Sequence, residues 1–458
     1  MGKRRLFLLD LVWLAALMAY ALVGVSAATF HGDEAMQIYM SSDYFTLAEG
    51  GSPRQLAVQP PYYIDSDPQL RILNGSVNRY LIGITWQAAG GTRDMLPPRP
   101  GWDWGLSYID NVATDHRPDQ ALLVAARLSS ALFFTLSIAL MFALAWQFGG
   151  RAPAWLASGV YGLHAALLLN GRRAMQEGSL LFFGLLAVLT AVIIVRRRAN
   201  AEQPPPPLVD GLLWIGLALS CALTLASKHS GIVFVAAALG WVWLAELARF
   251  SFGRLLRVTA LSALCGAGAL AIFVALSPAL WNDPPARFSD LLAVRAELLD
   301  IQVGTVPGGS MDMEMRAEWL LLQPFIAPPM YYEVTAWNDV PPVMDEIAAY
   351  EASGFAGLHY GWVVGGGLTL LALFGILALI FRLFRPRAAD DRGLALGMLF
   401  WLLVTCASLL ANPLPWQRYY LPLMAATAPL TGVGLLALAR IVKTFRHNHN
   451  GDRLRSPA

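Results

Sequence analysis

The sequence predicts an all-α membrane protein with about ten transmembrane helices and two long polar loops. Hydrophobic residues make up 56% of its 458 residues and charged residues only 14%, whereas soluble domains carry roughly 25% charged residues. The apolar residues are collected in runs that approach the ~20 residues needed to cross a bilayer as a helix. The polar residues are collected in two long segments, 30–118 and 279–356. This pattern is typical of a polytopic membrane protein.

Ten apolar runs follow one another along the chain, and the polar segments divide them into groups of one, six and three. Nearly all ionisable residues lie at the ends of the runs rather than inside them. We therefore expect each run to form one transmembrane helix. The expected helices cover residues 6–28, 119–147, 152–170, 178–195, 209–227, 230–248, 256–278, 358–383, 393–411 and 418–442.

The first run lies between Lys3-Arg4-Arg5 and Ala27-Ala28, a pattern that also resembles a cleavable signal peptide. Its apolar part is longer than the ~7–15 residues of a signal sequence. Cleavage after Ala28 would also detach the membrane anchor beside Asp33 and Glu34. We therefore interpret this run as a retained transmembrane helix.

The first polar segment contains two amphipathic stretches, residues 33–48 and 70–89. In the first, Met36, Tyr39 and Met40 fall near one helical face, and the second repeats this spacing. Helices of this kind tend to lie in the plane of the membrane interface. Ordinary helices of a small extramembrane domain remain an equal alternative.

The distribution of basic residues predicts how the chain is oriented, because cytoplasmic loops are enriched in Lys and Arg. With a cytoplasmic N-terminus, residues 1–442 form one transmembrane domain whose two polar segments are extracytoplasmic. Residues 443–458 then form a cytoplasmic basic tail that we expect to be disordered. The basic residues of the cytoplasmic loops include Lys3, Arg4, Arg5, Arg151, Arg196, Arg197, Arg198, Arg249, Arg254, Arg257, Arg382, Arg392, Arg440 and Lys443.

Composition excludes some classes of function. Basic residues occur in short clusters between apolar runs and form no basic domain, so nucleic acid is not an expected partner. Cys221, Cys265 and Cys406 each lie inside an apolar run. We interpret them as small core residues and expect neither a disulfide nor a metal site.

Asp33 and Glu34 follow the first apolar run directly, so two carboxylates lie at the mouth of a membrane helix. Ionisable groups are costly inside a bilayer, and those near it often serve function. The alternative is a solvated loop that merely ends the helix.

Basic residues in short extracytoplasmic loops oppose the orientation bias and therefore need a reason. Arg172-Arg173, Lys228-His229 and Arg418 are in such loops. One explanation is pairing with loop carboxylates such as Glu177. The other is a shared cationic pocket for an anion, on the same membrane face as Asp33 and Glu34.

A lipid phosphate suits such a pocket, because its head group meets the cations while its tail lies against the helices. If the lipid carries a sugar, transfer to a hydroxyl or similar acceptor needs one carboxylate to accept a proton. The phosphate leaving group departs without an acid to protonate it, but it needs positive charge nearby to stabilise its negative charge. A glycosidase would instead need two facing carboxylates, so one base with a cation cluster favours glycosyl transfer.

Six segments on one membrane face resemble a known family. The chain looks like a GT-C glycosyltransferase of the protein O-mannosyltransferase and aminoarabinose (lipid A) transferase type. The matching segments are His31-Gly32-Asp33-Glu34-Ala35, Asp67-Pro68-Gln69-Leu70, Gly171-Arg172-Arg173-Ala174-Met175-Gln176-Glu177, Ser227-Lys228-His229-Ser230-Gly231, Pro278-Ala279-Leu280-Trp281-Asn282-Asp283-Pro284 and Gln417-Arg418-Tyr419-Tyr420-Leu421-Pro422.

The resemblance implies a polyprenyl-phosphate monosaccharide donor, inversion at the sugar, and a protein, lipid or glycan acceptor. It implies that Asp33 is the general base, with Glu34 beside it. No cofactor is expected, although Asp283 and Glu333 could hold a divalent cation. The candidate residues for the donor phosphate are Arg172, Arg173, Lys228, His229, Arg418 and Tyr419, and those for the rest of the substrates are Arg79, Glu177, Trp281, Asn282 and Asp283.

Two other functions remain open from the sequence. A transporter or flippase for lipid-linked glycans would need a polar path across the helices, which the end-located charges disfavour. An inactive relative would bind a glycolipid without reacting. In each case we expect a multi-pass cell membrane protein, in a bacterial inner membrane by family analogy, with its active face extracytoplasmic.

Overall fold

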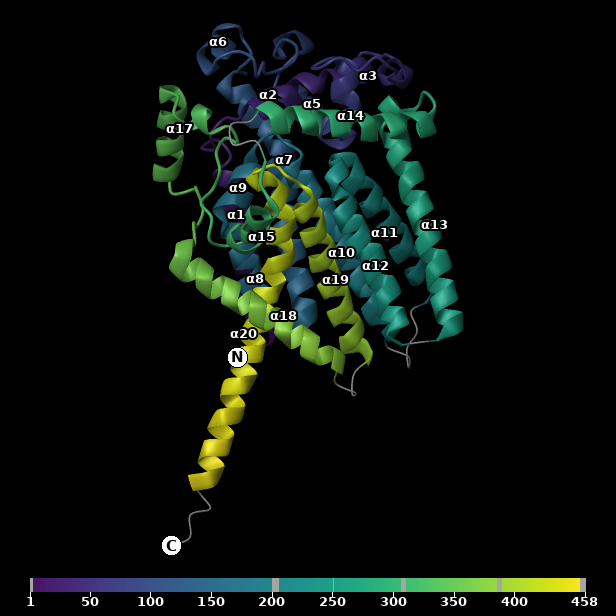
Figure 1. Cartoon of the computed structure of the whole chain (residues 1–458), viewed down its shortest axis with the longest axis vertical. Coiled ribbons are helices and arrows are strands. Elements are labelled where there is room, and N and C mark those ends of the chain that lie inside the picture. The colour runs from purple at the N-terminus through teal and green to yellow at the C-terminus, as the bar shows by residue number, and fades with distance from the viewer. Residues whose placement is uncertain (1–2, 200–205, 250, 306–309, 385–388, 454–458) are drawn as a thin grey trace.

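The computed structural model describes residues 3–199, 206–249, 251–305, 310–384 and 389–453. Helices connected by loops make up this part of the chain, and it contains no strand (Figure 1). An isolated β-bridge joins His164 to Leu358 within these residues. The predicted all-α fold class is confirmed.

Nine helical segments within the described residues are long and apolar enough to cross a membrane. Short turns precede three of them and extend their apolar length: η3 (His229–Gly231), η5 (Gly361–Gly365) and η6 (Gln417–Tyr420). The nine helices are α1 (Lys3–Val23), α7 (Gln120–Gly149), α10 (Glu177–Ala199), α11 (Pro207–Ser227), α12 (Ile232–Leu247), α13 (Phe252–Leu276), α18 (Gly366–Phe384), α19 (Ala389–Ala411) and α20 (Leu421–Arg453).

The tenth expected helix, over 152–170, is not continuous. It is divided into α8 (Arg151–Leu163) and α9 (Ala165–Arg172), because His164 adopts an extended conformation with ψ 121°. Its Nδ1 accepts the N–H of Ala166 at 3.2 Å, so the side chain caps the start of α9. The expectation of one uninterrupted helix here is therefore wrong, although α8 and α9 still pack inside the bundle (Figure 1).

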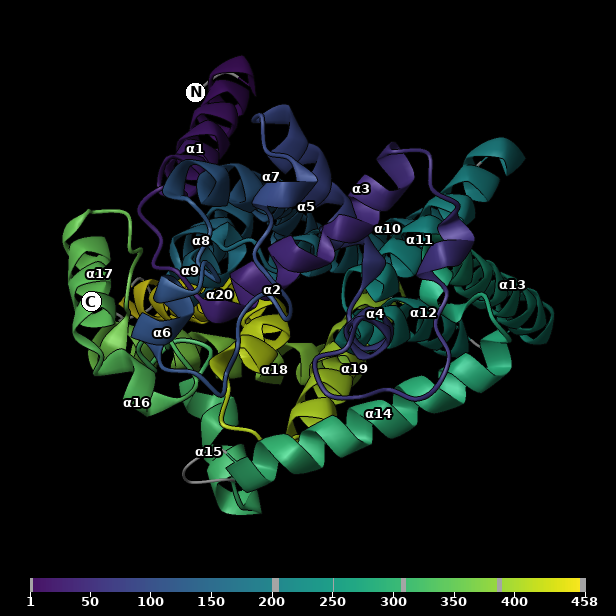
Figure 2. The ribbon, with the colours of Figure 1, turned by 90° about the horizontal axis from the view of Figure 1, so that it is seen from above.

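At one end of the bundle, four helices of the two polar segments, α2, α3, α5 and α14, lie across the ends of the membrane helices (Figures 1 and 2). We call residues 32–114, which contain α2 to α6 and the turns between them, together with α14 the polar layer. The orientation of α2, α3 and α5 is the one expected of interfacial helices. These segments contain α2 (Gly32–Met40), α3 (Ser42–Ala48), η1 (Pro53–Leu56), α4 (Asp67–Leu73), α5 (Ser76–Ala88), η2 (Arg93–Met95), α6 (Tyr108–Ala113), η4 (Pro278–Leu280), α14 (Pro284–Thr305), α15 (Met313–Leu322), α16 (Thr335–Asn338) and α17 (Pro341–Ala352).

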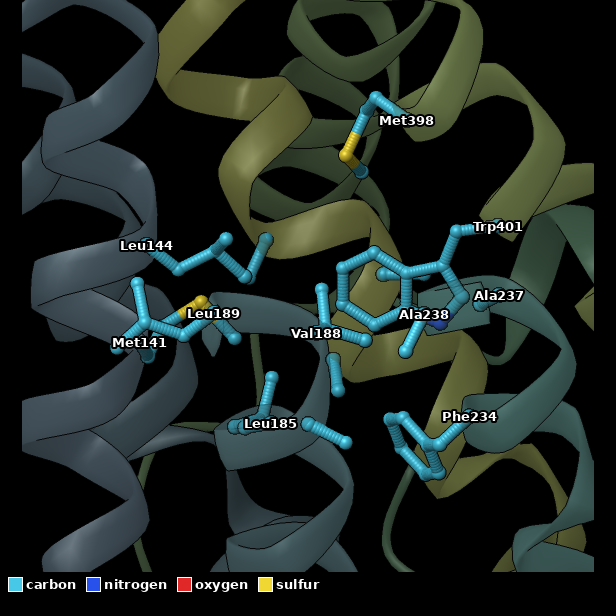
Figure 3. Close-up of a cluster of buried hydrophobic side chains, with 14 of the residues drawn as sticks. Met141, Leu144, Leu185, Val188, Leu189, Phe234, Ala237, Ala238, Met398 and Trp401 are labelled. Atoms are coloured by element: carbon cyan, nitrogen blue, oxygen red, sulfur yellow. The ribbon is translucent and has the colours of Figure 1, made fainter. Parts of the chain in front are cut away.

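The core of the bundle is formed where α7, α10, α12 and α19 meet (Figure 3). Trp401 of α19 and Phe234 of α12 are fully buried there, against Val188 of α10. Close packing rather than water exclusion stabilises helices in lipid, so small residues matter at such contacts. At Gly397 an added Cβ would lie 1.9 Å from the Trp241 ring. All three cysteines are free, and Cys221 and Cys265 are buried in the bundle, as predicted for core residues.

The opposite end of the bundle carries the start of α1 and the C-terminal part of α20 (Figure 1). There Arg151 pairs with Asp10 at 2.7 Å and Arg198 with Asp210 at 2.8 Å. Helix α20 continues to Arg453, although we expected disorder from residue 443. No glycine or proline interrupts the chain between Gly434 and Gly451, which explains why the helix persists. Residues 454–458 of the expected tail lie outside the described part.

Candidate active site

Asp33 lies in the first turn of α2, at the inner edge of the polar layer. The Nδ1 atom of His31 accepts the N–H of Asp33 at 3.1 Å, and Glu34 accepts the N–H of His31 at 3.0 Å. This reciprocal cap starts the helix after His31 and fixes the Asp33 backbone. The helix N-terminus also favours a negative charge at this position.

Arg418 connects Asp33 with a second carboxylate. Its guanidinium pairs with Asp33, and its Nε lies 3.0 Å from Glu333 Oε1. Glu333 also accepts from His31 Nε2 at 2.8 Å, which carries the ring proton because Nδ1 is an acceptor. The Asp33 side chain is 21% exposed and those of Arg418 and Glu333 are each 13% exposed. Residues from three distant parts of the chain therefore meet at one partly open place.

The charges around Asp33 favour its ionised form. Burial alone would raise the pKa of the carboxyl, but Arg418 and His31 outweigh this effect and hold it below its usual range. Burial likewise opposes ionisation of Glu333, and Arg418 and His31 again lower that pKa well below normal. Both groups are therefore carboxylates at neutral pH, and Asp33 is able to accept a proton.

A second ion pair joins this group through Tyr419. Lys228 Nζ lies 2.6 Å from Glu177 Oε1 and 5.5 Å from the centre of the Tyr419 ring. Arg418 approaches the same ring at 6.0 Å. The other oxygen of Glu177 is buried and has no protein partner. We call Asp33, Glu333, Arg418, Lys228 and Glu177, gathered around Tyr419, the charged cluster.

Glu34 is directed away from the charged cluster, although it is adjacent to Asp33 in sequence. Its carboxylate makes a two-point pair with Arg127, at 2.7 and 2.8 Å, and also accepts from Ala174 N at 2.8 Å. Burial would raise the pKa of Glu34, but Arg127 more than compensates and lowers it. Both side chains are fully buried. These contacts indicate a structural role and leave no open oxygen for a substrate.

Arg172 and Arg173 are likewise used internally. Arg172 donates to the carbonyls of Ala21 and Tyr20 at 2.8 and 2.7 Å, and also contacts Tyr350. Arg173 donates to Thr29 and to the carbonyl of Tyr331. Both arginines are essentially inaccessible. They anchor the C-terminal end of α1 and the second polar segment. Their hydrogen bonds go to residues outside the charged cluster, although Arg173 lies near enough to Glu333 to interact with its charge.

The remaining predicted residues lie apart from the charged cluster. Arg79 pairs with buried Asp43 at 2.7 Å, and His229 lines a small cavity beside this pair. Asp283 caps α14 in a left-handed conformation, φ 62°, and Asn282 next to it is exposed. Trp281 donates to the carbonyl of Val274 at 2.8 Å. No sequence signal distinguished these residues from Lys228 or Arg418.

Three residues at or near the site have roles that the sequence did not predict: Glu333, Arg295 and Arg127. Glu333 was considered only as a metal ligand, whereas it contacts Arg418 and His31. Arg295 of α14 donates to Tyr419 Oη at 3.1 Å, and Arg127 holds Glu34. Asp283 and Glu333 do not share a site, and the described residues contain no group of three or more His, Cys, Asp or Glu that could hold a metal.

Comparison with known proteins finds one matching sequence profile and several similar folds. Residues 103–282 match the sequence profile described as dolichyl-phosphate-mannose-protein mannosyltransferase. The Archaeoglobus fulgidus oligosaccharyltransferase in its apo form superposes with a TM-score of 0.52 and 13% identity, over 97% of this chain and 52% of that chain. The chain has the GT-C glycosyltransferase fold. The predicted family resemblance and fold class are confirmed.

Two further solved structures are similar to this chain. The A. fulgidus enzyme AglB in complex with an inhibitory peptide and a dolichol-phosphate has a TM-score of 0.52 and 12% identity, over 96% of this chain and 52% of that one. ArnT from Cupriavidus metallidurans matches with a TM-score of 0.48 and 10% identity, over 93% and 59% of the two chains. The chain spans about half the length of AglB. No curated protein matches its sequence.

Proposed function

We propose that this GT-C protein transfers a monosaccharide from a polyprenyl-phosphate donor to a hydroxyl or similar acceptor at the extracytoplasmic membrane face. The observation that carries the proposal is the contact between ionised Asp33 and Arg418, with Lys228 across the same Tyr419 ring. One proton acceptor and two cations thus lie beside the ends of α11 and α20, where we propose that a membrane lipid presents its head group.

Asp33 is proposed as the general base. Its carboxylate is ionised and partly exposed, and it lies at a helix start that the His31 cap fixes in place. Glu34 is proposed to position α2 through Arg127 rather than to react. Glu333 holds Arg418 and His31 on the other side of Asp33. A single reacting carboxylate fits transfer better than glycoside hydrolysis, which needs two.

Arg418 and Lys228 are proposed to bind the leaving phosphate. Arg418 offers a planar donor pair and Lys228 a point charge, and phosphates are bound by both kinds of group. In this arrangement each cation is neutralised by a carboxylate, Asp33 or Glu177. A donor phosphate competes for Arg418 and thereby loosens its hold on Asp33 as the reaction begins. The dolichol-phosphate found in the AglB complex supports a lipid phosphate of this class.

The proposed reaction balances without a cofactor. The acceptor oxygen attacks the anomeric carbon from the face opposite the phosphate, so the sugar is inverted. The bond between that carbon and the phosphate oxygen breaks, and its electron pair leaves with the polyprenyl phosphate. The acceptor proton passes to Asp33. Arg418 and Lys228 stabilise the charge that develops on the phosphate.

The test compares Asp33→Asn with the wild type in proteoliposomes. Radiolabelled polyprenyl-phosphate-mannose and polyprenyl-phosphate-arabinose serve as donors, and solubilised membranes serve as the acceptor source. We expect transfer to fall about 100-fold or more, because a general base contributes roughly that factor. Polyprenyl-phosphate affinity should persist. Asp94→Asn, which changes an exposed carboxylate in the polar layer, is the matched control and should transfer normally.

Three outcomes would contradict the proposal. Turnover of Asp33→Asn at the wild-type rate would remove Asp33 from the reaction. Lipid translocation without sugar transfer would favour a flippase. Binding of the donor with no reaction, even with the lipid that mass spectrometry finds copurifying with the protein, would indicate a non-catalytic glycolipid-binding protein.

A further inference from the structure

Helix α2 presents a narrow open stripe that starts at the proposed base. Its residues Asp33, Met36 and Tyr39 are partly exposed, whereas Glu34, Ala35, Gln37, Ile38 and Met40 are buried. The three open positions are spaced three residues apart and therefore follow one face of the helix. From Asp33 to Tyr39 the stripe is about 9 Å long, at 1.5 Å per residue.

Aromatic rings border the first half of this stripe. Trp104 is 37% exposed, its ring centre lies 5.8 Å from that of His31, and its Nε1 lies 3.4 Å from Met36 Sδ. Trp337 packs edge-on against Trp104 at 5.3 Å. Trp104 therefore keeps more than a third of its surface exposed next to His31 and Met36 of the stripe. Exposed aromatic faces next to polar groups are typical binding surfaces.

A polar cleft adjoins the far end of the stripe. Tyr39 Oη donates to Asp67 at 2.6 Å, and Asp67 lies 3.7 Å from Arg71. Arg71 in turn lines a cleft of about 370 Å³ within the polar layer. This volume falls within the range of small-ligand sites. The other lining residues are Thr46, Glu49, Gly51, Gln55, Leu56 and Arg93.

The chemistry of the cleft favours a neutral ligand with many hydroxyl groups. Arg71 is paired with Asp43 at 2.8 Å, and Arg93 with Glu49 at 2.8 Å, so the cleft offers fixed donors and acceptors without an uncompensated cation. A phosphorylated ligand would have to displace the carboxylates from both arginines, whereas hydroxyl groups can bond to these pairs as they stand. A lipid chain would need an apolar lining, and Leu56 is the only apolar side chain among the lining residues. Sugar hydroxyls match alternating donors and acceptors, and sugar rings match the Trp104 face.

We propose that the acceptor is a neutral glycan of at least two sugar units. Its terminal hydroxyl lies at Asp33, its terminal ring lies against Trp104, and the preceding units follow the α2 stripe to the cleft at Arg71. This inference rests on the proposed function and specifies its acceptor class. It makes Trp104 and the cleft residues determinants of acceptor binding and leaves donor binding to the charged cluster.

The test measures saccharide binding to the intact protein in nanodiscs by saturation-transfer NMR and calorimetry. The probes are mannotetraose, arabinotetraose and maltotetraose, with a serine- and threonine-rich peptide as the alternative acceptor class. We expect at least one tetrasaccharide to bind. Trp104→Ala and Thr46→Trp, which remove the ring and fill the cleft, should each weaken binding about tenfold, equivalent to about 1.4 kcal/mol.

Matched controls separate this inference from general damage. Trp146→Ala removes a tryptophan of similar exposure, 38%, near the opposite end of α7, and Thr114→Trp enlarges an exposed threonine elsewhere in the polar layer. Both should bind the saccharide normally, and all variants should keep polyprenyl-phosphate affinity. The inference is overturned if no tetrasaccharide binds, if Trp104→Ala and Thr46→Trp bind normally, or if the peptide binds in their place. If the wild type still turns over the donor in those cases, only the acceptor inference fails. If the wild type does not turn over the donor, the proposed function fails.

Discussion

Arg418 makes contacts to Asp33 and Glu333 that determine the charge state of the whole site. A guanidinium between two carboxylates keeps both ionised although burial opposes this, as the lowered pKa of each shows. The same group is the proposed phosphate ligand. One residue therefore links activation of the base with recognition of the donor.

This link predicts a pH effect. In the wild type the pKa of Asp33 lies below its ordinary value of about 3.9, so the midpoint of the acid limb of kcat/KM should lie below that pH. The charge of Arg418 is the largest effect that opposes the influence of burial on Asp33. Its removal in Arg418→Gln should therefore raise the pKa of Asp33. The acid limb of the kcat/KM profile should then move to higher pH. Arg54→Gln, an exposed arginine of the polar layer, is the control and should leave the limb unchanged. An unmoved limb in Arg418→Gln would show that Asp33 does not titrate in the reaction.

Glu34 yields a prediction about stability. Glu34→Gln leaves Arg127 buried without its carboxylate partner, and breaking such a pair costs about 3–5 kcal/mol. The Tm of the purified protein should fall clearly. Glu49→Gln breaks the Arg93 pair, in which both side chains are about half exposed. It should change stability by less than about 1 kcal/mol. Equal Tm values for the two variants would contradict the structural role of Glu34.

The sequence predicts which end of the bundle carries each charged residue better than it predicts which partner that residue contacts. Arg172 and Arg418 both occupy short loops at the same end of the bundle, and the sequence gives no ground to separate them. Arg172 donates hydrogen bonds to carbonyl groups at the C-terminal end of α1, which lack partners within the helix. Arg418 meets side chains instead. Which donor finds a free carbonyl depends on tertiary contacts that no local pattern encodes.

Among the helices, the continuous apolar runs could be predicted and the interruption at His164 could not. Residues 152–170 are apolar almost throughout, so hydropathy gives no sign of the break between α8 and α9. The break depends on His164 bonding to Ala166 and to the carbonyl of Pro324 at 2.9 Å. Pro324 is far along the chain, and its position follows from the fold as a whole.

Helix contacts also bring the polar layer to the charged cluster. Gly75 precedes α5, and an added Cβ would lie 2.2 Å from the carbonyl oxygen of Ser227, the last residue of α11. Lys228 follows immediately. The glycine therefore allows α5 to rest directly on the backbone that carries a proposed phosphate ligand.

Gly75→Ala should consequently displace α5 from the end of α11. Overpacking of this kind costs about 1–3 kcal/mol, so we expect a lower Tm together with weaker donor binding. Gly211→Ala, on α11 itself but with open space around the added methyl group, is the matched control. Wild-type donor affinity in Gly75→Ala would show that this contact does not position Lys228.

For the molecule as a whole, charge is divided between the two ends of the bundle. The polar layer and the charged cluster lie at one end, whereas the basic loops with Arg151 and Arg198 lie at the other (Figure 1). The cytoplasmic preference of basic loops predicts that the second end faces the cytoplasm. The proposed site then faces outward.

This orientation can be tested by cysteine labelling in spheroplasts, in a background without the three native cysteines. Tyr63→Cys replaces a side chain of the first polar segment that is 71% exposed, and Arg257→Cys replaces one at the basic end that is 73% exposed. A membrane-impermeant maleimide should label Tyr63→Cys at once and Arg257→Cys only after permeabilisation. The reverse result would place Asp33 in the cytoplasm. Water-soluble nucleotide sugars would then be available to the site, and the main reason for a lipid-linked donor would disappear.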